Sequence, residues 1–124
     1  MQGARKGSHS YSVLQGKSKR CYFTDTETGP LERHHIYFGV GMRQISDKHG
    51  FWVWLKPEWH RGTSGVHGRD GHKIDLRLKQ DCQRKFEETH TRAEFMAIIG
   101  RNYLGDEPEG KPQMPADTGG FYLL

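Results

Sequence analysis

The chain has few cysteines and no long apolar run. Cys21 and Cys82 are its only cysteines and do not form a CxxC pair, which excludes a zinc knuckle with four cysteine ligands. No apolar stretch approaches the roughly 20 residues that a membrane-spanning helix needs, and the first residues lack the continuous apolar segment of a secretory signal. Hydrophobic residues make up 33% of the 124 residues, so we expect one small domain with a modest core. A reduced, cytoplasmic setting is therefore expected.

Charge is unevenly spread along the chain. The net charge is +4 with neutral histidines, yet residues 105–124 hold four acidic side chains against one lysine. Residues 1–19 carry four basic side chains and no acidic one. We expect a flexible basic arm over 1–19, a domain over 20–104 and a flexible acidic tail, rich in proline and glycine, over 105–124. A basic body favours a phosphate-rich partner, so DNA bound mainly through its phosphates is expected, with no membrane partner.

Hydrophobic patterns predict an α+β fold. The expected strands are 21–24, 34–38 and 51–55, of which the last is rich in aromatic and β-branched residues. Glycines and Ser46-Asp47 predict a loop between the last two strands. Pro57 suits the first position of a short helix. Apolar residues four apart predict a helix from Asp70 to about residue 89, and the capping box Thr91-Glu94 opens another that ends at Gly100.

Histidines are the most informative residues. The chain has eight, and five fall within residues 34–67, among them His34, His35, His60 and His67. A neutral imidazole nitrogen is a common ligand of divalent transition metals. A histidine beside a ligating one can instead serve as a general base. The cluster therefore predicts a hydrolytic metal site with one ring to spare.

The order of these elements matches a known pattern. Glu32-Arg33-His34-His35-Ile36, then the apolar strand 51–55, then Lys56-Pro57-Glu58-Trp59-His60 resembles the HNH endonucleases, the His-Me finger or ββα-metal nucleases. The resemblance covers about residues 20–75 and extends to small HNH proteins of phages and prophages. It implies a ββα-metal hairpin-plus-helix core, followed here by two additional C-terminal helices. It also implies a metal-dependent DNA endonuclease that leaves 5′-phosphate and 3′-hydroxyl ends.

The resemblance also implies roles for single residues. His34 and His60 would be metal ligands and His35 the general base. His67 would be the third ligand, with His72 as its substitute because His60 and His67 are seven residues apart with two glycines between them. The implied cofactor is one divalent ion: zinc, magnesium, manganese or nickel.

The family's middle residue is replaced here, and arginines lie beside the histidines. The family's middle asparagine orders the loop between the strands, but the only asparagine of this chain is Asn102, outside the motif. His49 or Asp47 would order that loop instead. The candidate phosphate-binding residues are the arginines beside the histidines: Arg33, Arg61 and Arg69.

Two other functions stay open at this point. The chain could be a non-catalytic, zinc-stabilised DNA-binding module, which four protein ligands on the metal would indicate. It could also be a small phage regulator that binds a host protein or a nucleoprotein complex, which scattered histidines would indicate. An open metal position beside an unligated His35 would favour cleavage. If the protein is phage-encoded, the host cytoplasm is its expected location.

Overall fold

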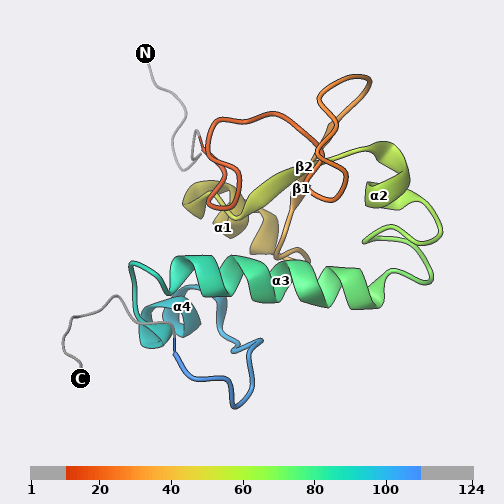
Figure 1. Cartoon of the computed structure of the whole chain (residues 1–124). Coiled ribbons are helices and arrows are strands. Elements are labelled where there is room, and N and C mark those ends of the chain that lie inside the picture. The colour runs from red at the N-terminus through yellow and green to blue at the C-terminus, as the bar shows by residue number, and fades with distance from the viewer. Residues whose placement is uncertain (1–10, 110–124) are drawn as a thin grey trace, which may run out of the picture.

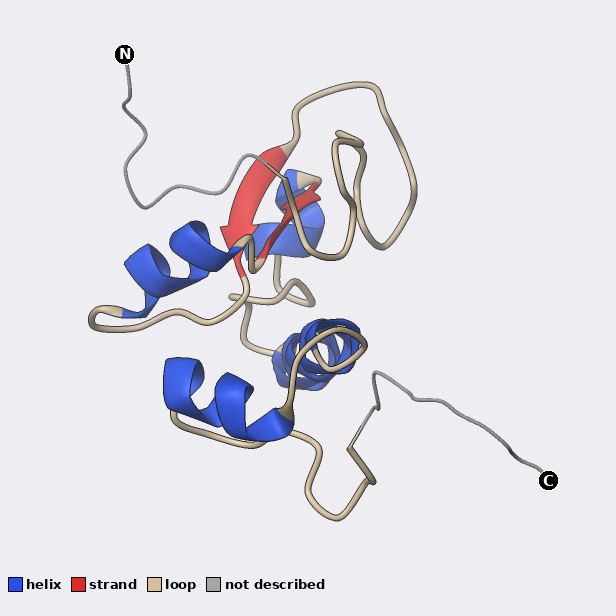
Figure 2. Cartoon of the chain, turned by 90° about the vertical axis from the view of Figure 1, so that its left-hand side faces the viewer, coloured by secondary structure: helices blue, strands red, loops and turns tan. Residues whose placement is uncertain are grey.

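The computed structural model describes residues 11–109, which form an α+β fold with one two-stranded sheet and four helices. The elements in chain order are β1 (Glu32–His35), α1 (Met42–His49), β2 (Trp52–Leu55), α2 (Pro57–Arg61), α3 (His72–Phe86) and α4 (Arg92–Ile99). α3 runs beneath the hairpin, and α4 lies beside the C-terminal part of α3 (Figure 1). Figure 2 views α3 end-on, with the hairpin on one side of it. Within the described range, no helix is both long and apolar enough to cross a bilayer.

The hairpin separates the two adjacent histidines. β1 and β2 pair antiparallel, with His34 opposite Val53 and His35 opposite Trp52. Successive side chains of a strand point to opposite faces. His34 and Val53 therefore share the buried face, where their exposed fractions are 1% and 0%. His35 lies on the other face.

The strand predicted at 34–38 is β1, which starts and ends earlier. Ile36 still donates its backbone N–H to the Phe51 carbonyl at 2.9 Å. The next residue, Tyr37, cannot continue the ladder, because the Ser46 hydroxyl accepts from its backbone N–H at 3.1 Å and donates to its carbonyl at 2.6 Å. A side chain from α1 therefore ends the strand.

Two segments differ from the predicted elements. Residues 21–24 form a turn rather than a strand: Cys21 and Asp25 are hydrogen-bonded in a closed loop, and Asp25 has a left-handed φ of 63°. The loop predicted between the strands contains α1, which is bounded by Gly41 and Gly50 with φ of 78° and 76°. Its eight residues are too few for a stable isolated helix. Burial of Ser46 against Tyr37 fixes α1 in place, and no local pattern predicts that contact.

The helices of the C-terminal half largely follow their sequence signals. Leu78, Cys82 and Phe86 of α3 are buried, as the four-residue spacing predicts, although the helix begins at His72 rather than at Asp70. The capping box of Thr91 and Glu94 is present, and Gly100 with φ of 87° ends α4.

The described parts of the predicted arm and tail contact the rest of the fold. The arm predicted over 1–19 contacts β2 from Ser12 onward: the Ser12 hydroxyl donates to the Trp52 carbonyl, and the Gln15 amide oxygen accepts from the Trp54 N–H at 2.8 Å. Part of the tail predicted over 105–124 is packed too, because Glu107 pairs with Arg84 of α3 at 2.8 Å. Backbone groups at the hairpin edge and one arginine of α3 supply these contacts. Residues 1–10 and 110–124 lie outside the described range.

Candidate metal centre

Three histidines from three separate segments converge. His34 comes from β1, His60 from α2, and His67 from the loop between α2 and α3. Their ring centroids lie 5.1 Å (His34 to His60), 4.9 Å (His34 to His67) and 5.0 Å (His60 to His67) apart. One ring nitrogen from each lies within 4.8 Å of the others. These residues are close enough to hold one metal ion together, as the sequence predicts.

A tight glycine loop brings His67 back to His60. Pro57 starts α2, and the chain then turns so sharply that a Cβ on Gly68 would lie 1.9 Å from the Gly62 carbonyl oxygen. Only glycine fits there. The His67 N–H donates to the His60 carbonyl at 3.0 Å, which fixes the two residues side by side. The spacing of seven residues is therefore bridged by a folded loop and not by a continuous helix.

His34 is the buried member of the triad. Neither of its ring nitrogens has a hydrogen-bond partner among the described residues. Burial, and then the neighbouring His67 and His60, lower its pKa to about 2. The ring is therefore neutral, with a lone pair available to a metal, at any working pH. Since leaving a buried polar atom unsatisfied costs about 1–3 kcal/mol, an orphaned histidine calls for an explanation. A metal ion bound to it would supply one.

Glu32 orients His60, although the sequence analysis did not predict this role. Its Oε1 lies 2.8 Å from His60 Nδ1, and both its oxygens accept from Arg61, the shortest distance being 2.7 Å. The hydrogen bonds from Arg61 and then from His60 lower the pKa of Glu32 to about 2. A charged carboxylate holds the proton of His60 on Nδ1 and leaves Nε2 for a metal, a common arrangement around ligating histidines. The only signal in the sequence was an acid two residues before His34, on the same strand.

His35 lies apart from the triad but opens on the same hollow. Its Nε2 is 3.4 Å from Oδ1 of Asp47, which also accepts from Arg33 at 3.1 Å. The side chain is 27% exposed. The hollow, of about 280 Å³, is lined by Arg33, His35, Arg43, His60 and His67. The contact with Asp47 uses Nε2 of His35 and not Nδ1.

The three arginines predicted to bind phosphate are placed differently. Arg33 lines the hollow, but its guanidinium is stacked 3.9 Å from the Trp52 ring centre and paired with Asp47. Arg61 is paired with Glu32. Arg69 is 81% exposed, lies beside Asp70 at 3.6 Å and does not line the hollow. None of the three presents an unpaired cation to the histidines.

Two further predictions concern His72 and the loop between the strands. His72 is exposed at the start of α3 and is not part of the triad, so His67 and not His72 is the third member. His49 stacks on Phe51 with ring centres 5.6 Å apart. Asp47, the other residue predicted to order this loop, contacts Arg33 and His35 of β1 at 3.1 and 3.4 Å. Ser46 adds hydrogen bonds to both backbone groups of Tyr37, just after β1. A serine within a glycine-marked loop carried no signal for this role.

Comparison of the chain with protein-family models, with curated proteins and with solved structures found no match. Chemically, three neutral imidazoles can hold one cation with coordination positions left for a substrate. The fourth imidazole, fixed by a carboxylate, can accept a proton at the same hollow.

Proposed function

We propose that this protein is a metal-dependent DNA endonuclease of the HNH type, which hydrolyses phosphodiester bonds to 5′-phosphate and 3′-hydroxyl ends. The observation that carries the proposal is the convergence of His34, His60 and His67 while His35 is held apart at the same hollow. Under this proposal, β1, β2 and α2 are the ββα-metal core. The net charge of +4 supports a nucleic-acid partner.

The triad is the proposed ligand set. A divalent ion bound there would offset the negative charge that develops on the phosphate and on the departing 3′-oxygen. A set of three imidazoles favours zinc or nickel over magnesium, which prefers oxygen ligands. Within the described range no fourth histidine, cysteine or carboxylate joins the group. A structural zinc site with four protein ligands therefore has less support than an open catalytic site.

His35 is the proposed general base. In this role Nε2–H donates a hydrogen bond to Asp47, which leaves the lone pair of the ring on Nδ1. Nδ1 takes a proton from a water molecule as the water oxygen bonds to phosphorus and the bond from phosphorus to the 3′-oxygen breaks. The Asp47 carboxylate then stabilises the imidazolium that results. Glu32 meanwhile keeps His60 in the tautomer that a metal requires.

The test is cleavage of supercoiled plasmid by the full chain, stripped of metal and reloaded in turn with zinc, nickel, manganese or magnesium. We expect His35→Ala to lower the cleavage rate by about 10²–10⁴-fold, the usual contribution of a general base, and to retain metal affinity. The matched control is His72→Ala, which removes an exposed histidine outside the triad. No cleavage with any ion, or equal cleavage by His35→Ala, would reject the proposal.

A further inference from the structure

One cation at the hollow has no assigned role. Arg33 and Arg43 both line the hollow. Arg33 is occupied, since it pairs with Asp47 and stacks on Trp52. Arg43 is exposed, and no hydrogen bond, ion pair or ring contact joins its side chain to any residue in the range 11–109. The Arg43 guanidinium thus lacks a counterion among the described residues.

The position of Arg43 within α1 makes its charge more unusual. It is the second residue of the helix, where the helix dipole places partial positive charge and favours acidic side chains. The first turn of α1 contains no acid, and Gly41 provides no side-chain cap. Local stability therefore disfavours an arginine here. Residues that contradict a local structural preference, such as the preference for acids in the first turn of a helix, tend to lie at functional sites.

We infer that Arg43 binds a phosphate group of the nucleic-acid backbone in the hollow, beside His60 and His67. This inference rests on the proposed function. It assigns to Arg43 the phosphate contact that the sequence predicted for Arg33, Arg61 and Arg69. The planar guanidinium matches two phosphate oxygens at once. Arg33 would have to leave Asp47 to do the same, and Arg61 would have to leave Glu32. Arg43 would have no bond to break.

The test is binding of the metal-free full chain to a labelled 12-base-pair duplex, followed by fluorescence anisotropy at several salt concentrations. We expect Arg43→Ala to weaken binding about tenfold, the effect of one lost charge-assisted contact. We also expect the slope of log affinity against log salt to fall by about 0.9, the value for one phosphate contact. Arg69→Ala is the matched control, because it removes the same charge from an exposed arginine outside the hollow. Its affinity should change by less than about twofold.

Arg43→Lys separates geometry from charge. Lysine keeps the charge but loses the two-pronged contact, so we expect affinity between those of wild type and Arg43→Ala. Thermal unfolding provides a check on folding: Arg43→Ala should melt no lower than wild type, since it relieves an unfavourable charge at the helix start.

The outcomes distinguish this inference from the proposed function. Equal affinities for Arg43→Ala and Arg69→Ala, or no binding by the wild type, would overturn the role of Arg43. A selective loss in Arg43→Ala supports it even if the wild type cleaves no plasmid with any metal, in which case only the hydrolytic function fails. Cleavage by the wild type with equal affinities of the two variants would keep the function and reject the inference.

Discussion

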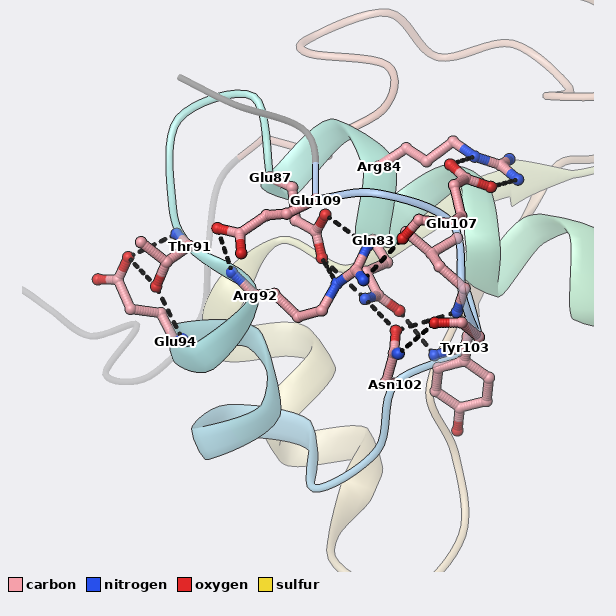
Figure 3. Close-up of polar contacts among 12 residues, drawn as sticks. Gln83, Arg84, Glu87, Thr91, Arg92, Glu94, Asn102, Tyr103, Glu107 and Glu109 are labelled. Atoms are coloured by element: carbon pink, nitrogen blue, oxygen red, sulfur yellow. Dashed lines mark hydrogen bonds and ion pairs between the residues drawn. The ribbon is translucent and has the colours of Figure 1, made fainter. Parts of the chain in front are cut away.

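Buried polar groups at the C-terminal end of α3 have hydrogen-bond partners, whereas those of the histidine triad do not all have them. At that end of α3, Gln83 donates to Glu87 and to Asn102, both at 2.8 Å, and accepts from the Tyr103 N–H (Figure 3). The Glu87 carboxylate is fully buried there, and Arg92 donates to both of its oxygens. In the histidine triad, by contrast, both ring nitrogens of the buried His34 lack partners among the described residues.

The difference separates a structural network from a candidate metal site. A buried network in which each group has its partner holds one arrangement of the chain, here the segment after α4 against α3. A buried group with lone pairs but no donor, facing two like groups, has the features of a site completed by something other than the protein. Both regions hold buried polar side chains, so burial does not distinguish them. What distinguishes them is whether those side chains have hydrogen-bond partners.

The largest expected effect comes from breaking the structural network. Arg92→Ala leaves the Glu87 carboxylate buried without its arginine, and we expect it to lower the free energy of unfolding by about 3 kcal/mol or more. Urea denaturation of the metal-free protein measures this loss. Arg77→Ala is the control. Arg77 pairs with Asp81 within α3 and is 75% exposed, so its loss should lower the free energy of unfolding by less than about 1 kcal/mol. Similar losses in both variants would contradict the structural role of the network.

The second prediction is a gain in stability, not a loss, on removal of His34 from the triad. Without metal, His34→Leu should stabilise the protein by about 1–2 kcal/mol, because two unpaired buried nitrogens give way to hydrocarbon of similar volume. With zinc at about 100 times its dissociation constant, the wild type should gain about 2.7 kcal/mol and the variant nothing. Urea denaturation with and without zinc would show the order of stability invert. A variant that is less stable than wild type in both conditions would make His34 an ordinary packing residue.

The smallest expected effect is the pH dependence of the contact between Glu107 and Arg84 of α3. Hydrogen bonds from Arg84 lower the pKa of Glu107 below its ordinary value of 4.5. Because the folded pKa is the lower one, the contact stabilises the fold above about pH 4.5 and loses its contribution as the pH falls through the lowered pKa. The melting temperature of wild type should exceed that of Glu107→Gln at pH 7, and this difference should shrink in acid. In an Arg84→Ala background the difference should not depend on pH; persistence there would assign it to another group.

Residue types and short spacings were enough to predict much of this protein. The capping box of Thr91 and Glu94 and the buried stripe of α3 follow from local chemistry. The grouping of His34, His60 and His67 was implied by the resemblance to the HNH endonucleases, which depends on residue types and their order along the chain.

Contacts between distant residues settled the rest. Glu32 meets His60 across 28 positions, and Asp47 meets His35 across 12, so no local pattern reports either pair. Ser46 made a helix stable where glycines predicted a loop. The arginines named from their sequence neighbours turned out to be paired or remote, whereas Arg43 remained available. A charged side chain is available to a ligand only when no other group of the protein pairs with it. Whether it is paired depends on residues far apart in the sequence, and so on the tertiary structure.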